Sequence, residues 1–470
     1  DLIVKLLNPD KEEEAAPEKA QSIKTTTISA AVSDGGSSGA VPLLEEQMHF
    51  GTKGINVSTG NFCCSFTDMV SEAPGFKINI GRTYNSRNTE KGIIGKGWTF
   101  EYEGKVTNNE GYVLVKYASG KVDIFTKESN NVYKAYNTRN QLAKQSDNTY
   151  ILTTKDQYTY KYNANGYLIE IKDRNGNAVT VNADDAGKIS SIADGAGKTY
   201  TFTYESFGDS SLLKTVKDDA GNRLVTYNYS LDSATGQYLL STVTDPMNNI
   251  TQRYYYDAKG YLTQIKDNDE NNTIQTVLYY DDDKHRVQTN KDALGNIFTY
   301  SYNDTADANK KRKTTVTDSQ SRTEIYWYDN EYYVTDVQDA EGKMTRVYYR
   351  LDENGINKYG EEDTRIDRYG NKTVYIRDSK GNITKLINPD LSIKNFAYDD
   401  KTNLIEERDE LGKTVYYVYD TAKKSLVKKV QPLNGKDAYN GEDRTSPKFA
   451  ITTYEYYPDA TYAAKGLLKQ

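Results

Sequence analysis

The fold is decided by a stretch that recurs along the chain, Tyr160-Lys161-Tyr162-Asn163-Ala164-Asn165-Gly166-Tyr167-Leu168-Ile169-Glu170-Ile171-Lys172-Asp173-Arg174-Asn175-Gly176-Asn177. In both of its apolar runs the larger side chains fall on alternate residues, as in a strand with one covered face. Asp173–Gly176 separates this unit from the next. Aspartate opens such a turn by accepting backbone N–H bonds, and glycine takes the positive φ. Each unit therefore predicts strand, turn, strand, turn.

The unit is repeated to the end of the chain. Tyr256–Asp267 and Tyr375–Leu386 are clear copies, and the registered turns follow one another at intervals of 21 to 28 residues. The turn residues are Asp173, Asp194, Asp218, Asp245, Asp267, Asp292, Asp318, Asp339, Asp367, Asn388 and Asp409, with Gln431 a weak further member. Glycines close seven of these turns, at Gly176, Gly197, Gly221, Gly295, Gly342, Gly370 and Gly412.

A single hairpin of this size is marginally stable, so the units must pair edge to edge into one continuous, twisting sheet. The sequence therefore predicts an all-β solenoid of hairpins, coiled into a hollow, shell-like sheet around a wet lumen.

Tyrosine dominates the aromatic residues, with 42 Tyr against 11 Phe and 2 Trp. A tyrosine ring packs on a half-buried sheet while its hydroxyl stays in water. This ratio, together with a mean hydropathy of −0.81, indicates extended β-structure with a large hydrated face.

The charge pattern argues against two classes of partner. The net charge is −7, from 60 basic and 67 acidic residues that are interspersed. No basic stripe forms, so we expect no nucleic-acid partner. No stretch approaches the roughly 20 apolar residues of a membrane span, so we expect none.

Three regions are expected along the chain. Residues 1–47 read as an extended arm, whose Leu2–Leu7 stretch we expect to add a strand to an exposed sheet edge and so to support self-association. Residues 48–150 form a β domain in which three glycines precede Trp98, an expected core anchor. Residues 151–470 form the hairpin array, which breaks off within a repeat, so we expect the parent polypeptide to continue.

Few residues are candidates for chemistry. Only His49 and His285 occur, which argues against a histidine metal site or a Ser–His–Asp triad. The acidic clusters 281–283 and 267–271 are either solvated loops, the favoured interpretation, or Ca²⁺ ligands. We therefore expect no catalytic residue, no metal site, no cofactor and no enzyme activity.

Two further features leave alternatives open. Cys63 and Cys64 are neighbours, which favours two small buried residues over an intermolecular disulfide and does not decide their oxidation state. Tyrosine triplets such as 254–256 favour structural stacking, with sugar or peptide binding as the alternative.

The pattern Tyr-Asp-x-x-Gly-x-Leu, followed by a strand and Asp-x-x-Gly-Asn, resembles the YD repeat of the RHS family. That family includes wall-associated bacterial proteins, the shell of Tc-toxin complexes and the teneurins. Arginine often follows the glycine in the family, whereas Tyr167 and Tyr261 stand there in this chain. The segments 59–60, 82–85 and 92–98 resemble the domain that precedes the repeats in many bacterial members.

The resemblance implies a hollow β-shell, in many members sealed around a C-terminal toxin. Its self-cleaving Asp-Pro-x-Gly core motif is absent, because Asp245-Pro246-Met247-Asn248 lacks the glycine and lies within the array. We expect a secreted or cell-surface bacterial protein whose non-enzymatic shell encloses a toxin or cargo encoded further C-terminal. The alternative is a surface-exposed or filament-forming adhesive protein, with carbohydrate as one ligand class.

Overall fold

The computed structural model describes residues 54–70, 78–135, 138–173, 176–194, 197–208, 210–219, 223–307, 311–352, 355, 357–420, 426–441 and 448–455. Within these residues every regular element is a β-strand and all pairing between strands is antiparallel. The all-β prediction is therefore confirmed. The described residues contain no helix that could cross a membrane. The arm 1–47, with Leu2–Leu7, and the last residues of the chain lie outside the described residues.

A small inner unit comes first in the chain. Its three-stranded sheet has the order β1-β2-β5, with β1 (Cys63–Val70), β2 (Asn79–Asn85) and β5 (Trp98–Phe100). A short hairpin of β3 (Lys91–Gly92) and β4 (Gly95–Lys96) precedes β5. Arg82 on β2 pairs with Phe66 on β1 and with Phe100 on β5, so these three side chains share one face.

All later strands form one long sheet in which each strand pairs with its neighbours in sequence. Its first strands are β6 (Lys105–Asn109), β7 (Tyr112–Lys116), β8 (Val122–Ser129), β9 (Val132–Ala135), β10 (Gln141–Lys144), β11 (Tyr150–Thr153), β12 (Thr159–Tyr162), β13 (Leu168–Lys172), β14 (Ala178–Ala183) and β15 (Ile189–Asp194). Then follow β16 (Thr199–Phe207), β17 (Ser210–Asp218), β18 (Leu224–Asp232), β19 (Gln237–Thr244), β20 (Ile250–Tyr256), β21 (Leu262–Lys266), β22 (Thr273–Tyr279), β23 (Val287–Asp292), β24 (Ile297–Asn303) and β25 (Arg312–Asp318). The last are β26 (Thr323–Tyr328), β27 (Val334–Gln338), β28 (Met344–Leu351), β29 (Asn357–Ile366), β30 (Lys372–Arg377), β31 (Ile383–Ile387), β32 (Ile393–Tyr398), β33 (Leu404–Arg408), β34 (Thr414–Tyr419), β35 (Leu426–Pro432) and β36 (Phe449–Thr453).

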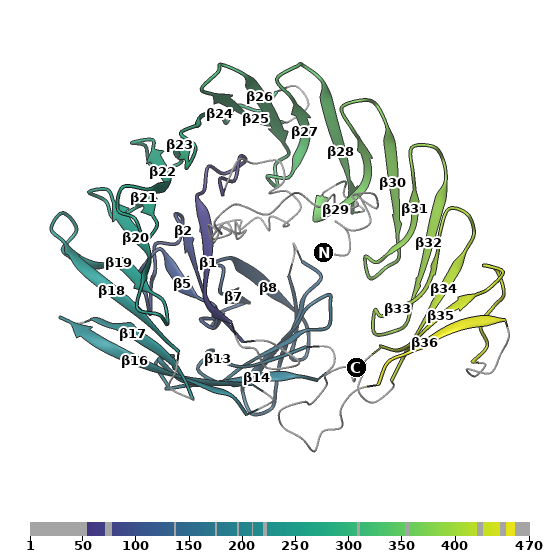
Figure 1. Cartoon of the computed structure of the whole chain (residues 1–470), viewed down its shortest axis with the longest axis horizontal. Helices are drawn as coiled ribbons and strands as arrows, with labels where there is room; N and C mark the ends of the chain where they lie inside the picture. The colour runs from purple at the N-terminus through teal and green to yellow at the C-terminus, as the bar shows by residue number, and fades with distance from the viewer. Residues whose placement is uncertain are drawn as a thin grey trace.

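The long sheet curves into an open arch (Figure 1). Pairing is continuous through β10, β11 and β12, so residue 150 lies inside the sheet. At its start the sheet also touches itself: Val106 N–H donates to the Gly166 carbonyl over 2.7 Å, and Leu168 N–H donates to the Gly104 carbonyl over 3.1 Å. Within the described residues, β36 pairs with β35 alone.

The inner unit fills part of the concave side. Strands β1, β2 and β5 lie inside the arch (Figure 1), and their buried side chains join the apolar face of the long sheet in one core. Phe66 and Trp98 contact Tyr254 of β20, with ring centroids 5.8 and 4.9 Å apart. This half of the concave side is therefore packed and dry, whereas the wet lumen of the sequence analysis would have left it hydrated. Further along, Tyr375, Leu386 and Phe396 form a small separate cluster.

Tyrosine hydroxyls bond neighbouring strands, in contrast to the expectation that they stay in water. Each donates to a main-chain carbonyl of the preceding strand, over 2.7 to 2.9 Å. The pairs are Tyr204–Ile189, Tyr229–Leu213, Tyr256–Leu240, Tyr279–Leu262, Tyr302–Val287 and Tyr349–Val334. All six accepting residues are buried, so phenylalanine would leave their carbonyls unpaired.

We predict that Tyr204→Phe lowers the free energy of unfolding by about 1 kcal/mol, because the Ile189 carbonyl loses its donor. Urea denaturation followed by tryptophan fluorescence measures the change. Tyr348→Phe is the control, since Tyr348 is 51% exposed, and it should change stability by less than about 0.5 kcal/mol. Equal effects of the two substitutions would contradict this role of the hydroxyl.

Candidate functional site

The predicted turn residues lie along one edge of the sheet, here called the Asp-Gly edge. Asp292 shows the geometry: its carbonyl accepts from Gly295 N–H and its own N–H donates to the Asn296 carbonyl, each over 3.0 Å. Its Oδ1 also accepts from Leu294 N–H and Asn296 N–H, over 2.9 and 3.0 Å. This is a three-residue hairpin loop with a bulge at the glycine. The same pair of main-chain positions is bonded at Asp173, Asp194, Asp245, Asp318, Asp339, Asp367, Asn388 and Asp409.

The remaining predicted positions vary this geometry. Where glycine is missing, another residue takes the positive φ: Asn248 (64°), Ser321 (63°) and Leu391 (66°). The turns at Asp218 and Asp267 are one residue longer, reaching Arg223 and Asn272. Gly221 lies outside the described residues.

The opposite edge, here called the Tyr-Asp edge, uses the same loop and was not included among the predicted site residues. Its turns begin at Asn163, Asp184, Asp257, Asp329, Asp378 and Asp399, and each N–H donates to the carbonyl four residues later. The Tyr-Asp dipeptide could have identified these turns in the sequence, since its tyrosine ends a strand and its aspartate begins the turn.

Trp98 sits at the junction of the inner unit and the long sheet. It is fully buried, and its Nε1 donates to the Tyr256 hydroxyl over 3.0 Å. The preceding glycine is required, because at Gly97, with φ of 77°, a Cβ would lie 2.6 Å from the Tyr84 ring. The tryptophan therefore fills the space between β2 and β20.

A buried charge pair accompanies Trp98. The Arg82 guanidinium donates to both oxygens of Asp68, over 2.8 and 2.9 Å, and to Gln252 Oε1 over 2.9 Å. Burial alone would lower the pKa of Arg82, but the attraction of Asp68 outweighs it and raises the pKa above the ordinary value. The side chains of Arg82 and Asp68 are 0% and 3% exposed, so each compensates the other's loss of water.

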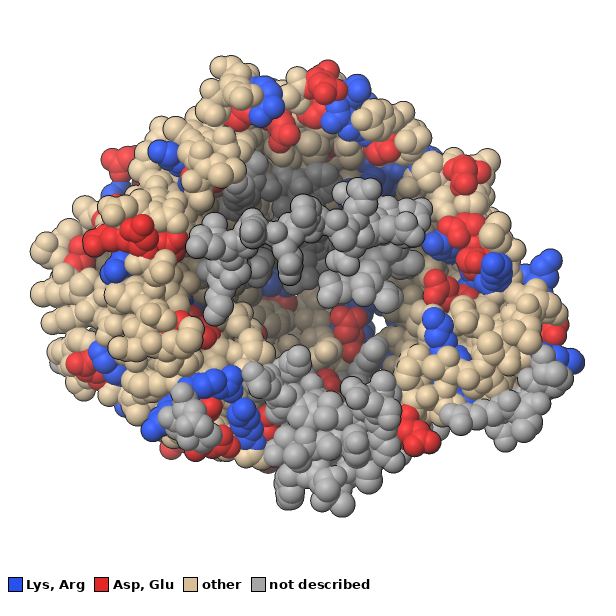
Figure 2. Space-filling model, viewed as in Figure 1, with Lys and Arg blue, Asp and Glu red and all other residues tan. Residues whose placement is uncertain are grey.

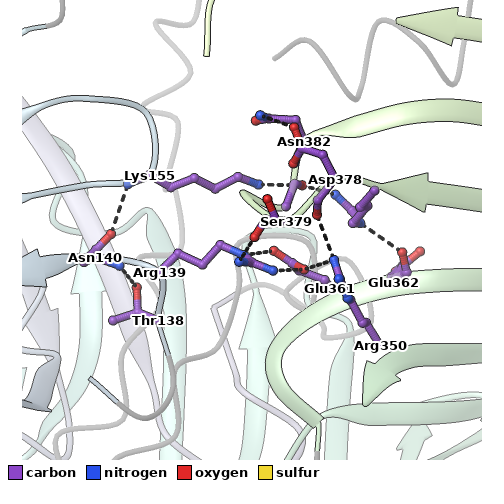
Figure 3. Close-up of polar contacts among 12 residues, drawn as sticks. Thr138, Arg139, Asn140, Lys155, Arg350, Glu361, Glu362, Asp378, Ser379 and Asn382 are labelled. Atoms are coloured by element: carbon purple, nitrogen blue, oxygen red, sulfur yellow. Dashed lines mark hydrogen bonds and ion pairs between the residues drawn. The ribbon is translucent and has the colours of Figure 1, made fainter. Parts of the chain in front are cut away.

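A second junction joins strands that are far apart in the chain, and we call it the clasp (Figure 3). Arg139, between β9 and β10, donates to both oxygens of Glu361 on β29, over 2.5 and 2.8 Å. It also donates to the Ser379 carbonyl over 2.7 Å, and Lys155 donates to the Gly381 carbonyl over 3.1 Å. Through the clasp, the Asp-Gly edge of the first strands meets the Tyr-Asp edge near β30 and β31.

The clasp concentrates cations around one carboxylate. Burial would raise the pKa of Glu361, but the bond and charge of Arg139 hold it below the ordinary value. Arg350 lies 3.7 Å from the same carboxylate, while burial lowers the pKa of Lys155. A polar cavity of about 610 Å³ adjoins the clasp, lined by both junction segments, including Tyr359 and Thr402.

The remaining candidates lie apart from one another. In the described part of the chain, no three His, Cys, Asp or Glu side chains gather as metal ligands. His285 stacks on Tyr261, with ring centroids 3.9 Å apart, and Asp281 pairs with Lys259. Cys63 and Cys64 are buried. His49 lies outside the described residues.

Comparison with known proteins gives one family model. Residues 52–125 match a domain of unknown function, DUF6531. This match covers the inner unit and the first strands of the long sheet.

Two curated relatives are named as tRNA nucleases. The tRNA nuclease WapA of Bacillus subtilis (strain 168) is 27% identical over 317 residues, which are 64% of this chain and 12% of that protein. The tRNA3(Ser)-specific nuclease WapA of Bacillus spizizenii is 26% identical over 136 residues, 29% of this chain and 6% of that protein. The chain thus spans about one eighth of the length of the relative that it matches over the longer stretch.

Among solved structures, a TcdB2-TccC3-TEV crystal structure is 14% identical, with a TM-score of 0.33 over 84% of this chain and 22% of that chain. The curated comparisons make the chain similar to a part of longer proteins named as tRNA nucleases.

Two sequence-based expectations are corrected by the relatives. The prediction that the protein is not an enzyme is wrong, because the curated relatives are named as nucleases. The composition and motifs of this chain gave no sign of an activity. The matched region is only 12% of the longer relative, so the name of that relative describes a protein of which this chain matches a small part. The exclusion of nucleic acid as a partner is likewise not supported, since these names specify tRNA.

We predict that Arg139→Gln opens the clasp, because a half-buried bidentate pair worth about 2 kcal/mol is lost. Spin labels at Lys134→Cys and Lys401→Cys should then show a longer and broader distance distribution in the variant. Arg322→Gln, which breaks the exposed Asp318 pair, is the control and should leave the distribution unchanged. An unchanged distribution in the Arg139 variant would contradict the role of the clasp.

The same labels should report a defined pH dependence. Because the pKa of Glu361 is depressed in the folded chain, its contribution is complete above the unfolded carboxyl pKa of about 4.3. It is lost as the pH falls through the lower folded value. The label distance should therefore stay constant from neutral pH to about pH 5 and increase only in stronger acid.

Gly381 offers a steric test. With φ of 85°, a Cβ there would lie 2.2 Å from Glu361 Oε1 and 2.6 Å from Arg139 Nε. Gly370 has φ of 86° and nothing within 4 Å of its Cβ, so both alanines carry the same backbone strain of about 1 kcal/mol. We predict a larger loss of thermal stability for Gly381→Ala than for Gly370→Ala, measured by calorimetry. Equal losses would contradict this prediction, because they would show that Glu361 and Arg139 can move away from the added methyl group at no cost.

Proposed function

We propose that this chain forms the wall of a chamber in a longer, RHS-type toxin-related protein, and that the chamber encloses a toxic cargo. The observation that carries the proposal is the clasp. A curved sheet alone is an open ribbon, but the ion pair of Arg139 and Glu361 brings its later strands back to its first strands. A curved sheet whose distant strands are joined in this way surrounds a space on its concave side.

The concave face of the later strands is polar enough to line a chamber. Paired residues share a face, so the register leads from Tyr254, which contacts the inner unit, through Tyr326 and Val337 to Tyr375. Beyond it the same face carries Glu407, Tyr417 and Lys429, and the Tyr417 hydroxyl donates to Glu407 over 3.0 Å. A surface of mixed charge and hydroxyl groups holds a polypeptide without strong apolar adsorption.

The names of the relatives support a proposal for the cargo. Those that the chain matches are named as tRNA nucleases and are much longer than the matched region. A nuclease domain is therefore the proposed cargo. We place the assembled protein outside the bacterial cell, secreted or at its surface, where a toxin is delivered. On the face seen in Figure 2, acidic and basic side chains are interspersed around the arch.

Labelling with reagents of two sizes tests the wall. Thr373 shares the concave face with Tyr375, whereas Ile376 on the same strand is 43% exposed on the other face. We predict that cysteine at either position reacts with a small maleimide. In the longer protein, a bulky polymer-linked maleimide should label Ile376→Cys at least about tenfold faster than Thr373→Cys, because the chamber would admit only the small reagent.

The parent chain, whose two cysteines are buried, gives the background. Equal rates of the two variants with the bulky reagent would overturn the proposal, since the concave face would then be open to large molecules.

A further inference from the structure

The most exposed apolar side chains of the described residues all lie on the Asp-Gly edge. Six are at least 68% exposed, whereas Leu351, the next, is 58% exposed. The six are Met247 (68%), Leu294 (85%), Tyr369 (70%), Leu391 (78%), Leu411 (77%) and Leu433 (68%). On the described part of the Tyr-Asp edge, the most exposed apolar side chains are Leu351 and Leu231, at 58% and 57%, so apolar groups are fewer and less exposed there.

Turn formation does not explain these residues. Leu294 and Leu411 occupy the third position of their turns, where the side chain points away from the ribbon. At the same position Glu341 serves the Asp339–Gly342 turn equally well, and its N–H donates to the Asp339 carboxylate in the same way as Leu294 N–H does to that of Asp292. Repeated exposed apolar groups along one edge mark an interaction surface.

The chain itself shows what covers an Asp-Gly edge. At the clasp, the first loops on this edge, at Arg139 and Lys155, are covered by the Asp378–Gly381 turn of the Tyr-Asp edge. Edge-to-edge contact is therefore already used within one molecule.

The uncovered parts of the two edges are complementary. Lys259 and Lys401 occupy the third position of their turns on the Tyr-Asp edge and are exposed, with Lys259 pairing with Asp281 within the chain. On the Asp-Gly edge, exposed Glu341 and Glu410 stand among the apolar tips. A lysine stem packs on an apolar side chain while its ammonium group reaches a carboxylate.

We propose that the Asp-Gly edge from Met247 to Leu433 binds the Tyr-Asp edge of a second copy of this chain. The two surfaces differ, so the contact is heterologous. Successive copies therefore add head to tail, into a ring or an open filament.

The double variant Leu294→Glu with Leu411→Glu tests the interface. Each substituted turn gains glutamate at the third position, as in Asp339–Gly342, so the fold is retained, as circular dichroism checks. In sedimentation velocity, the parent chain should gain mass with concentration and the variant should remain monomeric. The dissociation constant should rise by at least about tenfold.

Tyr348→Glu is the matched control, because Tyr348 is 51% exposed in the middle of β28 and away from both edges. It should associate as the parent does. Lys259→Glu with Lys401→Glu tests the partner edge and should also weaken association.

Three results would overturn the proposal. The first is a parent chain that stays monomeric up to its solubility limit. The second is a leucine double variant that associates as the parent does. The third is association that depends on the leucines but is unchanged by both lysine substitutions, since the Tyr-Asp edge would then not be the partner.

Discussion

The structure depends on the aspartate carboxylate that opens most of the turns. Asp292 and its counterparts accept main-chain N–H groups two and four residues later, which are the groups that a reversing chain leaves without a partner. Because the same loop recurs at both edges of the ribbon, it fixes the register of the strands that it joins. The tyrosine hydroxyls then bond carbonyls of the preceding strand, as Tyr204 does for Ile189. Turn and hydroxyl together specify a ribbon that needs little core of its own.

Local features of this ribbon could be predicted from the sequence. Alternation and turn residues gave the all-β class and the positions of strands from Tyr160 onward, because both are short-range properties. The hydroxyl bonds could not be foreseen, since the acceptor carbonyl of Ile189 is about fifteen residues away and is available only in the paired strands. The positive φ of non-glycine residues such as Leu391 also could not be predicted, because the surrounding hairpin imposes this unfavourable backbone conformation.

The two junctions were beyond prediction for another reason. Arg139 and Glu361 are 222 residues apart, and nothing near either residue marks the other. Arg82 likewise meets Tyr254 across 172 residues. Such pairs arise from the curvature of the whole ribbon, which a repeat pattern does not contain. The repeats thus determine the strands and turns of the ribbon, and a few long-range pairs join strands that are far apart in the chain.

The position of the inner unit has a consequence for synthesis. Residues 54–102 leave the ribosome before every strand that covers them, and their partners, such as Tyr254, follow much later. Hairpins of the ribbon form from neighbouring residues and therefore quickly, whereas the closure around Trp98 must wait for distant sequence. The apolar face of the early segment therefore stays uncovered until later hairpins pack against it. In the finished structure, the long sheet curves around the part of the chain that is made first.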